Sequence, residues 1–65
     1  MFVIERDINA VTLTLSVDEL GLLNNSINEA LEALDTDEFE VRVGATKEQA
    51  TKLLQEFGKI LGRGA

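Results

Sequence analysis

The chain has 65 residues, a formal net charge of −6, and neither cysteine nor histidine. A chain of this length buries only about 60% of the surface that its unfolded form exposes, so we expect one domain over residues 1–65 with little stability to spare. Disulfides are excluded and the usual zinc ligands are missing, which leaves self-association as the common support for so small a domain. We therefore expect a homodimer. With no early apolar run long enough for a signal peptide or a membrane span, we expect it to be cytoplasmic.

Residues 2–15 are predicted to form a β-hairpin, because both halves are rich in β-branched residues and the second half alternates in polarity. The turn is expected over residues 7–10. Val11, Leu13 and Leu15 are expected to face the core, because an isolated hairpin is marginal in water and must pack on something. The free strand edges are an alternative contact for a second subunit.

A long amphipathic helix is predicted over residues 17–34. Its apolar residues recur at steps of three and four, and Ser16 with Glu19 forms a capping box at its start. Asn24 and Asn28 lie one turn apart on this helix. Such a pair can border the apolar stripe or bind a partner, and we take both residues as candidate partner-binding residues.

Residues 36–43 fit two interpretations. Alternating apolar residues fit a third strand, whereas a cap at Thr36 with Phe39 and Val43 one turn apart fits a short helix. We favour the helix slightly, because Gly44 can end it in the left-handed conformation.

The last helix is predicted over residues 47–61, where Thr46 and Gln49 form a second capping box and apolar residues recur with helical spacing. Together these elements predict an α+β fold, in which an N-terminal β-hairpin packs on two longer amphipathic helices joined by a short helical or extended segment. A thin core of this kind gains from burial between subunits.

Charge is unevenly distributed along the chain. Residues 1–40 contain ten acidic residues and one arginine, whereas residues 41–65 contain five basic and two acidic residues. The first interpretation is solubility together with attraction between the two ends, and the second is an acidic face that binds a basic protein. The candidate residues of that face are Glu29, Glu32, Asp35, Asp37, Glu38 and Glu40.

The residue inventory argues against an enzyme, because general acid–base catalysis would fall to carboxylates in a solvated acidic run, or to lysine. We expect no catalytic residue, no cofactor and no metal site. Phe39, Arg42 and Gly44 are candidate structural residues. Phe39 is expected in the core, the Arg42 guanidinium is expected to tie Glu38, Glu29 or a helix C-terminus to the loop, and Gly44 is expected to end a helix.

Residues 39–54 resemble the helix-turn-helix of bacterial repressors, with Gly44, Ala45 and Thr46 in the turn. This resemblance implies DNA binding through Gly44–Leu54. The acidic run before the turn and the small number of bases on the second helix oppose it, so nucleic acid ranks last among the partners.

A larger part of the chain resembles a group of short uncharacterised bacterial proteins. The shared features are a helix with Leu23, Asn24, Asn25, Asn28 and Glu29, a segment with Glu38, Phe39, Arg42 and Gly44, and a leucine-rich last helix with Leu53 and Leu54. The resemblance implies no activity. Val41 departs from the small polar residue expected there, which favours the strand interpretation at that point.

The sequence thus predicts a small self-associating interaction or regulatory module. An acidic immunity-like or antitoxin-like inhibitor of a basic partner is the first alternative, and a DNA-binding regulator is the second. Whether the hairpin edge or the helical faces make the subunit contact stays open.

Overall fold

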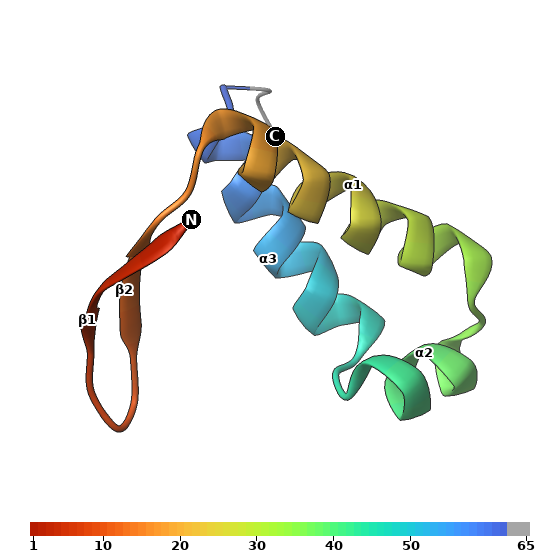
Figure 1. The fold of residues 1–65 in the computed structure, drawn as a ribbon. Helices are drawn as coiled ribbons and strands as arrows, with labels where there is room; N and C mark the ends of the chain where they lie inside the picture. The colour runs from red at the N-terminus through yellow and green to blue at the C-terminus, as the bar shows by residue number, and fades with distance from the viewer. Residues whose placement is uncertain (63–65) are drawn as a thin grey trace.

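The computed structural model describes residues 1–62, which form an antiparallel hairpin followed by three helices (Figure 1). The strands are β1 (Phe2–Arg6) and β2 (Val11–Thr14), and the helices are α1 (Val17–Ala33), α2 (Thr36–Val43) and α3 (Lys47–Ile60). The predicted α+β class is confirmed, as is the order of hairpin, long helix, short element and long helix.

The hairpin turn depends on the side chain of Asp7. Its Oδ1 atom accepts hydrogen bonds from the amides of Asn9 and Ala10, at 2.7 and 2.8 Å, and the Asp7 amide donates to the Ala10 carbonyl at 2.9 Å. An aspartate that bonds the backbone two residues on is a common way to fix a tight turn. The strand register shifts between Val3 and Glu5, which is a local irregularity of the ladder.

The two long helices begin at the capping boxes that the sequence predicts. The Ser16 hydroxyl accepts from the Glu19 amide at 3.0 Å, and the Glu19 carboxylate accepts from the Ser16 amide at 2.9 Å. Thr46 and Gln49 repeat this arrangement at 3.1 and 2.9 Å. Each box satisfies two amides that the first helical turn leaves without partners.

The segment that fitted both a strand and a helix is the helix α2. It spans Thr36–Val43, and its N-cap is Asp35 instead of the predicted Thr36: the Asp35 Oδ1 atom accepts from the Glu38 amide at 2.8 Å. A carboxylate suits this position because the helix dipole favours negative charge there. Gly44 ends α2 in the left-handed conformation, with φ of 82°.

Helices α1 and α3 pack against each other in antiparallel fashion, so that the start of α1 lies near the end of α3 (Figure 1). The helix α2 packs on α3 at the other end of this pair. Only Leu20, Phe39 and Ala50 are buried in the described residues. Each helix therefore contributes a single buried residue.

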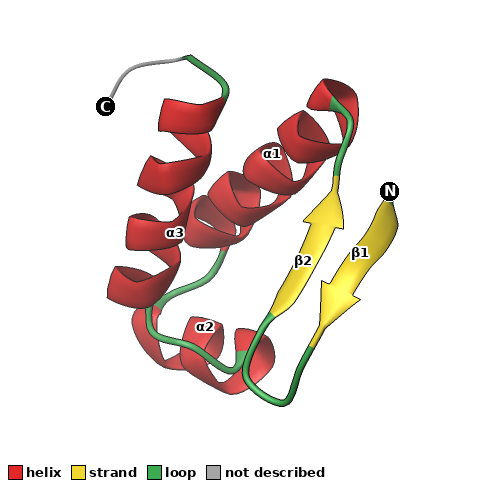
Figure 2. Cartoon of the chain, turned by 90° about the vertical axis from the view of Figure 1, so that its left-hand side faces the viewer, coloured by secondary structure: helices red, strands yellow, loops and turns green. Residues whose placement is uncertain are grey.

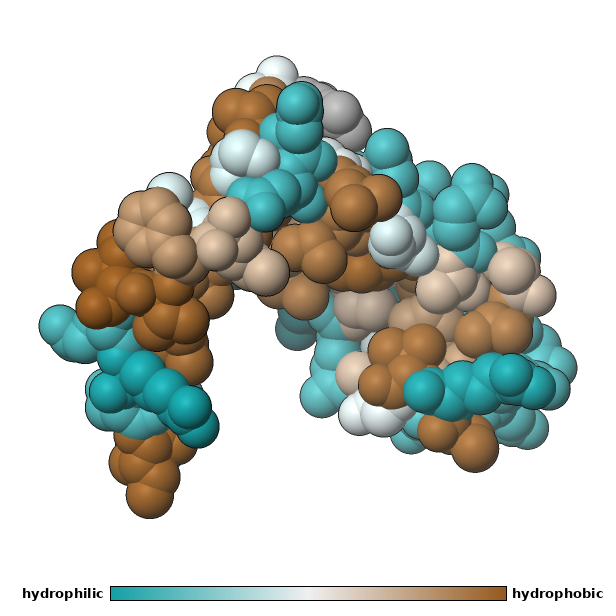
Figure 3. All heavy atoms as spheres, viewed as in Figure 1, coloured by the Kyte–Doolittle hydropathy of each residue, from teal (hydrophilic) through white to brown (hydrophobic). Residues whose placement is uncertain are grey.

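The hairpin does not pack on the helices as the sequence predicts. Every residue from Met1 to Thr14 is exposed, including Val11 at 48% and Leu13 at 38%. The chain passes from β2 into α1 through two residues (Figure 2), and the hairpin then stands apart from α3 and α2 with open space between them (Figure 3). Of the three residues predicted to face the core, Val11 and Leu13 are therefore exposed, whereas Leu15 is half-buried.

Candidate functional site

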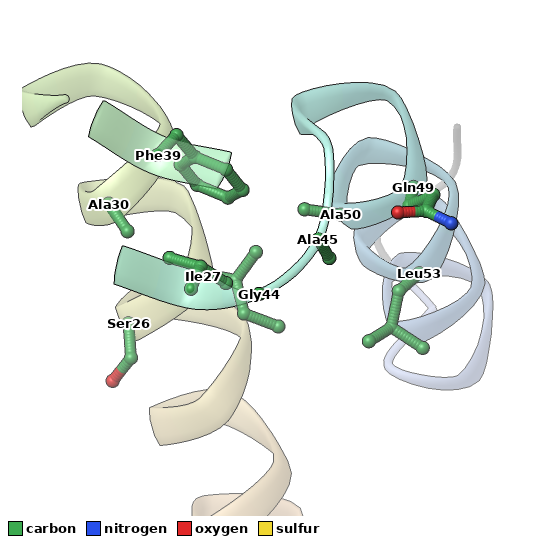
Figure 4. Close-up of a pocket in the computed structure, with 10 residues that line it drawn as sticks. Ser26, Ile27, Ala30, Phe39, Gly44, Ala45, Gln49, Ala50 and Leu53 are labelled. Atoms are coloured by element: carbon green, nitrogen blue, oxygen red, sulfur yellow. The ribbon is translucent and has the colours of Figure 1, made fainter. Parts of the chain in front are cut away.

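An apolar cavity of about 510 Å³ lies near the α2 end of the helical pair. Ile27, Ala30 and Phe39 lie on one side of it, and Ala45, Ala50 and Leu53 on the other (Figure 4). The complete lining is Ser26, Ile27, Ala30, Phe39, Val43, Gly44, Ala45, Gln49, Ala50 and Leu53. None of these side chains is charged. A cavity of this size falls within the range of binding pockets, roughly 300–1,000 Å³.

The cavity exists because small side chains occupy positions that face it from two helices. Ala30 on α1 and Ala50 on α3 both lie on apolar stripes, yet a methyl group cannot fill the space between two helix axes. Leu53 lines the cavity and is still 46% exposed. The result is an apolar surface that the chain itself leaves uncovered.

The two polar residues of the lining make hydrogen bonds within their own helices. The Ser26 hydroxyl donates to the Leu22 carbonyl at 2.8 Å, and the Gln49 Oε1 atom accepts from the Thr46 amide at 2.9 Å. The Ser26 hydroxyl and the Gln49 Oε1 atom are thus already engaged in hydrogen bonds to the backbone. An apolar occupant suits such a lining better than a charged or strongly polar one.

Lys47 holds α1 and α3 together beside the cavity. Its Nζ atom donates to the Leu31 carbonyl at 3.1 Å, in a partly buried position. That carbonyl belongs to the last turn of α1, where backbone acceptors lack helical partners and a cation is favourable. Lys47 therefore has a structural partner.

The six candidate acidic residues are all exposed and spread over the end of α1, the connecting turn and α2. Asp35 caps α2, and Glu38 forms an ion pair with Arg42 one turn along the same helix. Within residues 1–62, the remaining four make no ion pair: Glu29, Glu32, Asp37 and Glu40. This acidic surface lies on the outside of the helices and is separate from the apolar cavity lining.

The remaining candidate residues lie at several different places. Asn24 is half-buried and Asn28 is exposed, both on α1. Phe39 is 1% exposed and Arg42 bonds Glu38 within α2 rather than the loop. The structure brings Phe39 into the cavity wall, but it does not gather the two asparagines and the acidic residues into one pocket.

The electrostatics of the described chain are mild. The Ser16 amide, and after it the terminal amino group of Met1 at 2.9 Å, hydrogen-bond the Glu19 carboxylate and lower its pKa below the ordinary value. Among residues 1–62 no group of three acidic side chains could hold a metal ion. In the same range no helix has both the length and the apolar character needed to cross a bilayer.

Comparisons with protein-family models, with curated proteins and with solved structures found no match to this chain. The resemblances to repressors and to short bacterial proteins therefore stay predictions. The candidate site rests on the geometry of the cavity and the hairpin. Sequence reasoning missed the cavity, although the alanines on both stripes were a visible signal of space between the helices.

Proposed function

We propose that the protein is a small non-enzymatic interaction module that acts as a homodimer. The observation that carries this proposal is that most large apolar side chains are exposed instead of buried. Fourteen large apolar side chains are exposed in the described residues, whereas three apolar residues are buried. Exposed apolar surface on this scale is typical of a protein–protein contact. A cytoplasmic location is part of the proposal, because a chain without cysteine needs no oxidising compartment.

The exposed area supports a partner of similar size. The accessible surface of the chain is 5188 Å² for a mass of 7.1 kDa. A compact monomer of this mass exposes about 4,100 Å², so the chain exposes about 1,100 Å² more than expected. A standard interface removes about 800 Å² from each partner, and a dimer would thus cover most of the excess.

Molar mass in solution, measured by multi-angle light scattering over a range of protein concentrations, tests the proposal. We expect a mass twice the 7.1 kDa of the chain. A mass of one chain at every concentration would overturn the homodimer. The exposed acidic surface of α1 and α2, with four unpaired carboxylates, would then become the leading candidate for binding a basic protein.

A further inference from the structure

We propose that the hairpin of one copy docks into the apolar cavity of a second copy, and that the exchange is reciprocal. This inference rests on the homodimer proposed above and names the two surfaces that form it. The surfaces are the hairpin face that carries Val3, Val11 and Leu13 and the cavity lined by α1, α2 and α3.

One face of the hairpin carries three apolar residues and one arginine. Residues that pair across antiparallel strands share a face, and Val3 pairs with Leu13 while Arg6 pairs with Val11. All three apolar residues of this face are exposed: Val3 at 60%, Leu13 at 38% and Val11 at 48%. The long side chain of Arg6 can extend from the end of such a face into water.

The opposite hairpin face is mixed. Phe2 pairs with Thr14, and Glu5 pairs with Thr12. Burying this face would remove a carboxylate and two hydroxyl groups from water, which is costly without new hydrogen bonds. The face with Val3, Val11 and Leu13 is therefore the one that suits an uncharged apolar cavity.

The cavity and the hairpin complement each other in chemistry and in form. The cavity lining has no charged residue, and its two polar side chains are bonded within their helices. The hairpin stands across an open space from the helices, so that one molecule has the form of an arch (Figure 3). A second hairpin can enter that space and lie against the helices.

A second copy is favoured over another occupant because one chain carries both uncovered surfaces. A twofold dimer with reciprocal docking covers two hairpins and two cavities with one type of contact. The excess surface of about 1,100 Å² per chain is close to the 800 Å² or so that each subunit loses in a standard interface. A second copy is therefore large enough to account for most of the excess surface.

Cysteine cross-linking tests this arrangement, because the natural chain has no cysteine. Chains with Val11→Cys are mixed with chains with Leu53→Cys and treated with a short bis-maleimide reagent. The matched control replaces Val11→Cys with Thr12→Cys, the neighbouring residue on the opposite hairpin face. We expect a product of twice the chain mass, formed several-fold more in the Val11 mixture than in the Thr12 mixture.

Four other outcomes would overturn the inference. Cross-linking within one chain, in a Val11→Cys and Leu53→Cys double variant of monomeric mass, would show that the hairpin closes on its own cavity. Efficient linking of two Val11→Cys chains, without linking to Leu53→Cys, would show that hairpins pair with each other. A dimeric mass with no link between Val11 and Leu53 would reject the docking but keep the homodimer, whereas a monomeric mass would reject both.

Filling the cavity provides a second measurement that does not depend on cross-linking. Ala30→Leu adds bulk to the cavity wall, whereas Ala33→Leu adds the same bulk at an exposed position outside the lining on the same helix. We expect Ala30→Leu to raise the dimer dissociation constant and Ala33→Leu to leave it nearly unchanged. Equal dissociation constants for the two variants would contradict docking in the cavity.

Discussion

Lys47 supplies the cation that the C-terminus of α1 lacks, because the last turn of α1 has no basic residue of its own. Replacing Lys47→Met keeps most of the aliphatic stem and removes the hydrogen bond to the Leu31 carbonyl. We expect a loss of about 1 kcal/mol in the free energy of unfolding, measured by urea titration. Lys52→Met, at an exposed position of the same helix, is the control and should change stability by only a few tenths of that. Equal losses in both variants would contradict the role of Lys47.

Substitution of glycine by alanine is expected to have opposite effects on stability at Gly44 and at Gly21. Gly44 has φ of 82°, so Gly44→Ala places a side chain in the left-handed conformation and should cost about 1 kcal/mol. Gly21 lies inside α1, and beyond its chain neighbours and the backbone of its own helix, a methyl group added there would meet no atom within 4 Å. Gly21→Ala should therefore stabilise the protein by about 0.5–1 kcal/mol. Thermal unfolding of both variants gives the two signs, and a stabilising Gly44→Ala would show that α2 ends differently.

Glu19 makes the helix cap sensitive to acid. Hydrogen bonds from the Ser16 amide, and then from the Met1 amino group, lower the pKa of Glu19 below 4.5 in the folded chain. The stabilisation is therefore complete above pH 4.5 and is lost as the pH falls through the folded pKa. Wild type and Glu19→Gln should differ in urea midpoint at neutral pH and converge in acid. A difference that persists in strong acid would mean that the charge of Glu19 is not the cause.

At the scale of the element, the packing of α2 depends on a single buried side chain, the ring of Phe39. Phe39 is the only buried residue of this helix and is 1% exposed. Phe39→Ala should cost about 3–5 kcal/mol, which is comparable with the whole stability of so small a domain. We expect loss of helical circular dichroism at ambient temperature, and Phe39→Leu should retain more of it. A cost below about 1 kcal/mol would contradict the central place of Phe39 in the core.

The helices and their caps could be predicted from the sequence because they depend on local chemistry. Ser16 with Glu19, and Thr46 with Gln49, contain both partners of each capping box within four residues. The secondary structure of residues 36–43 is harder to predict, because the apolar residues of so short a segment fit both the alternation of a strand and the spacing of a helix. The deciding contact, from Asp35 to the Glu38 amide, is also local but competes with an equally plausible cap at Thr36.

The placement of the hairpin and the cavity could not be predicted in the same way. The alternation of Val11 and Leu13 with threonines shows that one hairpin face avoids water, but it does not show which surface covers that face. Ala30 and Ala50 lie on correctly predicted stripes, yet the hollow between them depends on how two helices separated in sequence approach each other. Both features depend on tertiary or quaternary contacts.

At the scale of the whole molecule, the chain is too open for its length. The radius of gyration is 13.0 Å, whereas a compact domain of this length has about 11 Å. The hairpin accounts for this difference, because it extends away from the helices (Figures 1 and 3). If a second copy fills the open space, the dimer becomes the unit that folds and the single chain is only part of it.

The dependence of the thermal unfolding midpoint on protein concentration tests this account most directly. If folding and association are linked, the midpoint rises steadily over about a hundredfold increase in concentration. We predict such a rise for the wild type and a weaker one for Ala30→Leu, whose cavity is filled. A cooperative transition with the same midpoint at every concentration would show that a single chain is stable alone, and it would contradict the central claim.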